Sequence, residues 1–189
     1  MASDVEICNM ALQAAGSGKR IVSVFPPDAS DSARSLNAVY AMIRDSELRA
    51  HSWNFAIKRA QLAASVTAPA FGPANAFPLP SDFLRILLPN DNALDWIIED
   101  SSILTDYSAP LEIRYVARIE DPALFDSAFT KAFAYRLALQ IVKALSDSTS
   151  LKESVREDYR DAIREARRNN AFDSVAQELP EDDWLAARR

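Results

Sequence analysis

The short run GSGK at residues 16–19 is the first pattern in the sequence that could carry chemistry, because glycine-rich loops with a lysine can hold phosphate groups. The phosphate-binding motif needs a glycine five residues before its Gly-Lys pair and a serine or threonine after the lysine. Gln13 and Arg20 stand at those two positions, and the run follows a predicted helix where the motif follows a strand. The run is therefore interpreted as a helix stop.

The titratable side chains offer no clear catalytic set. His51 could act as a general base because histidine titrates near neutral pH, yet no cysteine or serine constellation points to it. Its neighbours Trp53 and Phe55 are core-type residues, which favours a structural histidine where a helix meets a sheet. Asp45 and Glu47 are two positions apart and would face different ways on a helix, so solvated surface is favoured over a glycosidase-type carboxylate pair.

The cysteine and histidine content excludes one kind of metal centre. Cys8 and His51 are the only residues of their types, so they cannot form a zinc site of cysteine and histidine ligands. The acidic segment 90–95 lacks the glycine and the terminal glutamate of a calcium-binding loop and is interpreted as an ordinary turn. With no catalytic, metal-binding or cofactor-binding residue identified, we expect a protein that is not an enzyme and needs no cofactor.

Composition and charge indicate a globular protein with a packed core. Of the 189 residues, 49% are hydrophobic and 25% are charged, close to the average for soluble proteins. The sequence lacks an apolar run near the roughly 20 residues that span a bilayer and lacks a signal-peptide pattern, so we expect a protein made in the cytoplasm, with no membrane partner. The net charge of −6 argues against a dedicated nucleic-acid binder, but an acidic wall would let DNA slide past.

Two helices are predicted before residue 54. Ser3 and Glu6 have the spacing of a capping box, and apolar residues then recur at helical spacing, which predicts a helix over residues 4–15. Asp28 or Ser30 can cap a second helix, whose apolar residues lie on one face and which ends near the histidine.

Residues 54–118 are predicted to form a β subdomain, because helical spacing stops and turn residues become frequent. The clearest strand covers residues 111–118, where apolar and mostly polar side chains alternate. Further strands are predicted near residues 54–62 and at 83–88, and a hairpin at 94–105 has a turn without the glycine typical of such turns. The proline-rich segment between the first two strands is predicted to be irregular.

Two more helices are predicted after the β subdomain. Asp121-Pro122 is predicted to begin the third, which is expected to be the central buried helix because only a narrow stripe of it is polar. Its aromatic residues recur at four-residue spacing: Phe125, Phe129 and Phe133. Ser150 and Glu153 have the spacing of a second capping box, which predicts a fourth helix that ends near residue 170.

Charged side chains form two rows along the predicted fourth helix. The acidic row contains Glu153, Glu157, Asp161 and Glu165. The basic row contains Arg156, Arg160, Arg164 and Arg168. Each acid has an arginine three residues further on, and such pairs stabilise a helix by only about 0.2–0.5 kcal/mol each. The rows are either a self-compensated solvated surface or an interface that joins identical subunits, acidic row against basic row.

The end of the sequence is predicted to be a C-terminal arm. Tryptophan and arginine are favoured interface anchors, whereas chain termini are commonly disordered, so a docking arm and a disordered tail both stay open. The residues proposed to dock on a partner are Leu179, Trp184, Leu185, Arg188 and Arg189.

The order of these elements predicts an α+β fold that is mainly α. Residues 1–53 and 119–170 are expected to form a four-helix bundle-like core. An antiparallel β subdomain, residues 54–118, is inserted between the second and third helices, and residues 171–189 form the arm.

Several stretches carry a resemblance through their order and spacing. They are VEICNMALQAAGSGKRIVSV, DSARSLNAVYAMIRDSELR running into SWNFAIKRAQLA, AFPLPSDFLRIL, and LEIRYVARIEDPALFDSAFTKAFAYRLALQIVKAL. Together they resemble the tail tubular protein A and related head-to-tail adaptor family of short-tailed bacteriophages. The likeness covers residues 5–170 and contains no catalytic signature.

The resemblance implies a homo-oligomeric ring, dodecameric in the family, in the neck of the virion between the portal protein and the tail or nozzle protein. DNA would pass through its centre without specific binding. The helices would pack around the ring, the β subdomain would face the tail, and the arm would reach the portal. Two other classes stay open, a cell-wall (peptidoglycan) hydrolase of the virion that uses buried carboxylates and a monomeric host-directed binding module.

Overall fold

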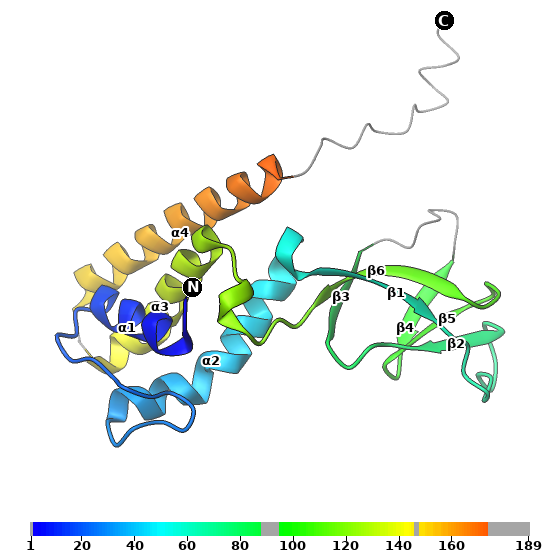
Figure 1. The fold of residues 1–189 in the computed structure, drawn as a ribbon, viewed down its shortest axis with the longest axis horizontal. Helices are drawn as coiled ribbons and strands as arrows, with labels where there is room; N and C mark the ends of the chain where they lie inside the picture. The colour runs from blue at the N-terminus through cyan, green and yellow to red at the C-terminus, as the bar shows by residue number, and fades with distance from the viewer. Residues whose placement is uncertain (1, 88–94, 146–147, 174–189) are drawn as a thin grey trace, which may run out of the picture.

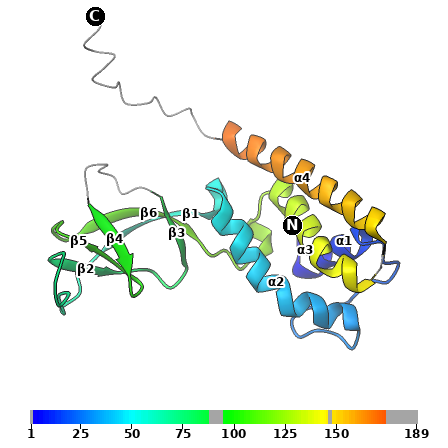
Figure 2. The ribbon, with the colours of Figure 1, turned by 180° about the vertical axis from the view of Figure 1, so that it is seen from behind.

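The computed structural model places helices and strands in two parts of an elongated molecule (Figure 1). The structure describes residues 2–87, 95–145 and 148–173. The helices occupy one end and the strands the other, as the view from behind also shows (Figure 2). The predicted portal-docking residues Leu179, Trp184, Leu185, Arg188 and Arg189 lie outside the described residues, as does most of the acidic turn predicted at 90–95.

The first helix, α1 (Asp4–Ala14), has the predicted capping box. The Ser3 hydroxyl accepts from the backbone N–H of Glu6 at 3.2 Å, and the Glu6 carboxylate accepts from the backbone N–H of Ser3 at 2.9 Å. Two N–H donors at the start of α1 are thereby satisfied. The helix stops at Gly16, whose φ of +77° lies in the left-handed region that favours glycine. The GSGK run is thus a helix stop, as predicted.

The second helix, α2 (Asp31–Ala50), points from the helical part toward the strands. The Ser30 hydroxyl caps it by accepting from the backbone N–H of Ala33 at 3.2 Å. The Asp28 carboxylate in turn accepts from the backbone N–H and the hydroxyl of Ser30. The helix ends with His51 as its C-cap residue. Both predicted ends of this helix are confirmed.

The third helix begins later than predicted. Asp121 caps only a short 3-10 helix, η2 (Pro122–Leu124), and α3 (Ser127–Leu145) follows it. The Asp126 carboxylate accepts from the backbone N–H groups of the first turn of α3, the nearest at 2.8 Å. Two aspartates of the same capping type precede this helix, and spacing alone does not select between them.

The predicted cap of the fourth helix is also wrong. The helix α4 (Thr149–Phe172) begins before Ser150, and its cap is Ser148, whose hydroxyl accepts from the backbone N–H of Leu151 at 3.3 Å. Several serines and a threonine precede this helix, and each of them can cap it, so spacing alone does not select one.

Two antiparallel sheets of three strands each form the β part. In the first sheet, β6 (Leu111–Ala117) lies between β1 (Ile57–Leu62) and β3 (Phe83–Leu87). In the second sheet, β5 (Ser102–Thr105) lies between β2 (Asn75–Pro78) and β4 (Trp96–Glu99).

Two strand predictions need correction. The first strand starts later than predicted, because a 3-10 helix, η1 (Asn54–Ala56), precedes β1. The proline-rich segment predicted to be irregular contains β2, whose last residue is Pro78. An edge strand tolerates proline because half of its backbone groups need no partner in the sheet, and β2 is such an edge.

The predicted hairpin is present as β4 and β5. Its turn is made by Asp100 and Ser101, whose φ angles are 43° and 56°. Two successive positive φ angles define the turn type that favours glycine, but aspartate also tolerates this conformation. The hairpin therefore forms without the glycine that the sequence lacks.

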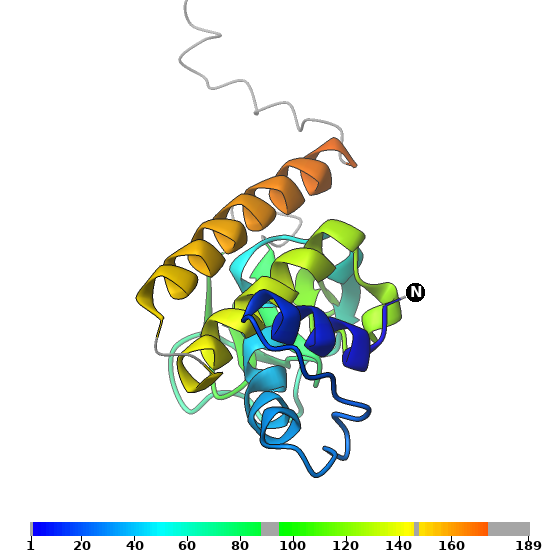
Figure 3. The same cartoon turned by 90° about the vertical axis from the view of Figure 1, so that its left-hand side faces the viewer.

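The core of the helical part is centred on α3, which packs against α1, α2 and α4 (Figure 3). Phe129 and Phe133 on α3 are fully buried, and Trp53 from the end of α2 contacts Phe129 edge-on at 4.9 Å between ring centroids. Aromatic pairs of this geometry add about 0.5–1.5 kcal/mol each beyond the area they bury. The prediction of a central buried third helix is confirmed.

The fold is α+β, with four α-helices and two small antiparallel sheets in the described parts of the chain. All strands lie between β1 and β6, and all α-helices lie outside that segment. None of the helices in the described residues is both long and apolar enough to span a bilayer.

Candidate interaction surfaces

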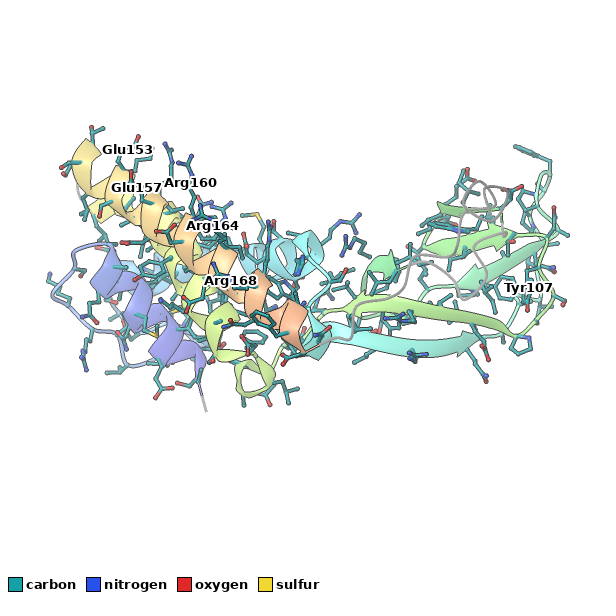
Figure 4. All side chains as sticks on the ribbon, turned by 90° about the horizontal axis from the view of Figure 1, so that it is seen from above. Tyr107, Glu153, Glu157, Arg160, Arg164 and Arg168 are labelled. Atoms are coloured by element: carbon teal, nitrogen blue, oxygen red, sulfur yellow. The ribbon has the colours of Figure 1, made fainter. Side chains whose placement is uncertain are left out.

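The outer side of α4 carries both predicted charge rows (Figure 4). The four acidic residues of the row are all exposed, and three arginines of the basic row are exposed while Arg156 is half-buried. The opposite side of the helix packs inward through residues that are almost fully buried: Val155, Ala162 and Ala166. The structure therefore brings the two rows together on one solvent-facing surface, which we call the α4 ridge.

Ion pairs within the chain neutralise part of the α4 ridge. Arg156 pairs with Glu153 at 3.3 Å, and Arg164 pairs with Asp161 at 3.1 Å, both three residues apart. Glu165 pairs with Lys131 of α3 at 3.2 Å. Exposed pairs of this kind contribute about 0.2–1 kcal/mol or less.

Three other residues of the α4 ridge have charges that are available to another chain. Glu157, Arg160 and Arg168 make no ion pair with any part of the chain that the structure describes. All three are exposed on the same helix, so the ridge still offers both signs of charge to a partner. Alternating charges of both signs on one surface suit a contact with an identical surface or with a second mixed surface.

A buried charge network joins α2, α3 and α4. The Glu47 side chain is only 8% exposed and accepts from Arg136 Nε at 3.1 Å and from the Tyr159 hydroxyl at 2.9 Å. The guanidinium of Arg136 also lies over the Tyr159 ring, 5.9 Å from its centroid. Burial, with the charge of Glu47 nearby, raises the pKa of Tyr159 above its usual range, so the phenol stays a donor. The interpretation of Glu47 as solvated surface is wrong.

Asp45 belongs to a second network of charged side chains, where α2 meets the segment that follows β6. It accepts from Arg44 Nε at 2.9 Å and from Arg118 Nε at 2.8 Å, and Arg118 follows the last strand, β6. Arg44 also lies 3.8 Å from the exposed carboxylate of Glu120. Asp45 and Glu47 thus hold different neighbours, and both are structural carboxylates. We call residues 44–63 the junction. Within it, Asp45 contacts the segment that follows β6, and Glu47 contacts α3 and α4.

Hydrogen bonds hold the last turn of α4 against the same junction. Asn170 Oδ1 accepts from the backbone N–H of Asn54 at 2.7 Å, and the Asn170 carbonyl accepts from Asn54 Nδ2 at 2.7 Å. Asn170 Nδ2 donates to the Ser52 carbonyl at 3.0 Å. These bonds fix the last turn of α4 beside the boundary between the helical part and the β part.

His51 is a structural histidine at this boundary, as the sequence predicts. Its ring lies edge-on to Trp53 at 4.7 Å between ring centroids, and Asn170 Nδ2 lies 3.4 Å from its Nε2. Burial lowers the pKa of His51, and the positive charges of Arg167 and Arg85 lower it further.

Stability should therefore fall as the solution becomes acidic. Folding favours the neutral ring, so the contribution of His51 is complete above the unfolded-state pKa of about 6.5 and is lost as the pH falls below that value. We expect His51→Gln to lose less unfolding free energy than the wild type between about pH 7 and about pH 5. Urea unfolding at both pH values measures this difference. Equal losses in the two proteins would contradict the assignment.

The thiol of Cys8 is buried. Burial raises the pKa of the Cys8 thiol to about 12, with the nearby charge of Asp4 acting in the same direction. Among the described residues, no group of three or more histidine, cysteine or acidic side chains is placed to hold a metal ion.

Comparisons with known proteins do not assign the chain to a family. No protein-family model matches it, and no curated protein matches it.

Proposed function

We propose that the chain is a structural head-to-tail adaptor subunit of a short-tailed bacteriophage, which assembles as a ring in the neck of the virion. In this proposal it is made in the host cytoplasm, binds the portal protein on one side and the tail or nozzle protein on the other, and forms part of the DNA channel. The proposal rests on the resemblance of residues 5–170 together with the surfaces described above.

The α4 ridge is the observation that carries the proposal. A ring of identical subunits needs two different surfaces on each subunit that fit each other, so that the contact repeats from copy to copy. The ridge presents an acidic row beside a basic row, with Glu157, Arg160 and Arg168 unpaired within the described residues. A four-helix bundle-like body, with α3 inside and α4 outside, would present this ridge to the neighbouring subunit.

The shape of the subunit also supports an adaptor. Its helices and strands lie at opposite ends of an elongated molecule, so each end can contact a different partner (Figure 1). The bonds of Asn170 hold the last turn of α4 at the junction. From there the arm, with Trp184 and Arg188, is proposed to reach the portal while the β part faces the tail.

Electron microscopy of the full chain mixed with the portal protein of the same phage tests the proposal. We expect closed rings stacked on the portal, and fewer of them for a variant that ends at Asp173 and so lacks the proposed docking residues. The truncation leaves the hydrogen bonds of Asn170 in place, so the variant should stay folded. Monomers that never bind the portal would contradict the adaptor function. Equal binding by the truncated chain would contradict the docking arm alone.

A further inference from the structure

The strand β4 is an exposed sheet edge with apolar side chains on both faces. Within the described residues it pairs only with β5. Ile97 is 47% exposed and Ile98 is 38% exposed, and successive residues of a strand point to opposite faces. An edge of this kind offers unpaired backbone N–H and C=O groups to a strand of another chain.

Two of the other three edges of the two sheets are protected. Beside β3, the Arg49 guanidinium donates to the Leu84 carbonyl, which brings the end of α2 against that edge. The edge strand β2 ends in Pro78, which has no N–H to offer. The edge strand β1 carries Lys58 and Arg59. The edges of β1 and β4 thus stay open, and they carry charges of opposite sign, because β1 has Lys58 and Arg59 and β4 has Glu99.

The strands of the first sheet are net basic, whereas the β4–β5 hairpin together with the residues beside it is acidic. The first sheet has four basic residues and one acidic residue in its strands: Lys58, Arg59, Arg85, Arg114 and Glu112. The β4–β5 hairpin and the residues beside it contain acidic residues and no basic one: Asp95, Glu99, Asp100 and Asp106. One part of the subunit therefore presents both signs of charge on separate strands.

The basic sheet has room for an acidic partner next to β1. Arg59 on β1 lies directly opposite Arg114 on β6, and the one carboxylate beside them, that of Glu112, balances only one of the two positive charges. Both arginines line a hollow of about 290 Å³ that is open to the surface beside Gln61 and Glu112. Carboxylates of a neighbouring chain would relieve the repulsion between the two arginines.

We propose that β4 of one copy pairs with the free edge of β1 of the next copy, with the acidic hairpin placed on the basic sheet. This inference rests on the proposed ring and adds a contact between strands to the subunit contact proposed for the α4 ridge. The β4–β5 hairpin and β1 lie on opposite sides of the β part when it is seen from above (Figure 4). Two different edges on opposite sides make a contact that repeats from copy to copy, as a ring requires.

Cross-linking of the full chain tests the pairing directly. A carbodiimide joins a lysine amine to a carboxylate in contact with it, and an equal mixture of isotope-labelled and unlabelled chain distinguishes links between copies from links within one. We expect links between copies from Lys58 to Glu99 or Asp100, which increase with protein concentration. Lys58 lies 2.7 Å from Asp82 of its own chain, so a link within one copy between these residues serves as the internal reference. Absence of links between copies, when the reference is present, would overturn the pairing.

Exchanging the charges of Glu99 and Arg59 distinguishes specific strand pairing from non-specific electrostatic attraction. Glu99→Arg and Arg59→Glu should each reduce the Lys58–Asp100 links between copies severalfold, and the double variant, with both charges exchanged, should restore them. Only the links to Asp100 are counted, because Glu99→Arg removes the Glu99 carboxylate. Asp31→Arg makes the same charge change as Glu99→Arg on an exposed helical residue far from both strands and should have no effect. No recovery in the double variant would overturn the pairing.

The two proposals fail in different ways. Rings on the portal whose copies never link through Lys58 would overturn the strand pairing and leave the adaptor function in place. Copies that link through Lys58 yet never bind the portal would support the pairing and contradict the adaptor function.

Discussion

Replacing Glu47 with alanine is expected to lower the free energy of unfolding by about 3 kcal/mol, because it leaves the Arg136 guanidinium and the Tyr159 hydroxyl without their acceptor in a buried site. Removing one partner of a buried ion pair usually costs about 3–5 kcal/mol. The lower end applies here because the Arg136 side chain is 31% exposed and can recover part of its hydration. Urea unfolding at neutral pH measures the change.

Two further variants show whether the loss belongs to the buried network. Glu47→Gln keeps an acceptor for Tyr159 but removes the charge that faces Arg136, so its effect should lie between those of the wild type and Glu47→Ala. Glu120→Ala removes a carboxylate that is 74% exposed and 3.8 Å from Arg44, and should cost less than about 0.5 kcal/mol. If Glu47→Ala were as mild as Glu120→Ala, the network would not hold the three helices together.

The helical part was largely predictable from sequence because its signals are local. The capping box of Ser3 and Glu6 and the stop at Gly16 depend on residues within one turn of each other. Where several capping residues follow one another, as before α3 and α4, the choice depends on how the helix packs. Asp126 was therefore missed in favour of Asp121, and Ser148 in favour of Ser150.

The β part was predictable in its strands and less so in their pairing. The alternation in β6 identified the strand that forms the centre of the first sheet. Its neighbours β1 and β3 lie far away in sequence, and β2 is a short edge strand between prolines. Pairing of distant segments leaves no local signal, so the order of strands in the two sheets could not be predicted.

The buried network was missed although part of its signal is in the sequence. Glu47 continues the helical spacing of Tyr40 and Ile43, so it falls on the apolar side of α2 and not on its solvated side. Its partner Arg136 is 89 residues away and lies in the narrow polar stripe of α3. A charge on an apolar helical face predicts a buried partner, but it does not identify that partner.

The charge rows of α4 were predictable because both rows follow one helical face, and the structure places them on the surface. What the α4 ridge contacts depends on a second molecule, and a test of that contact must change the ridge without unfolding the helix. Arg160 and Arg164 are the best positions, because both are exposed and neither packs into the core.

Reversing Arg160 and Arg164 to glutamate should abolish ring assembly on the portal while the isolated chain stays folded. Each new carboxylate stands three residues from an acid of the same ridge, Glu157 or Asp161, which costs only about 0.2–0.5 kcal/mol for each pair. Between subunits, the same reversal removes the basic row that faces the acidic row of a neighbour and replaces attraction with repulsion at every contact of the ring. Electron microscopy counts the rings, and circular dichroism measures the helix content.

The matched control is the reversal of Lys19 and Arg20, two exposed basic residues after α1, which changes the net charge by the same amount away from the ridge. Rings should form normally in that variant. If both double variants assembled equally well, the α4 ridge would be a solvated surface whose pairs only compensate each other. If both failed equally, net charge and not the ridge would control assembly. Only loss of rings confined to Arg160→Glu/Arg164→Glu, with helix content preserved, places the subunit contact on α4.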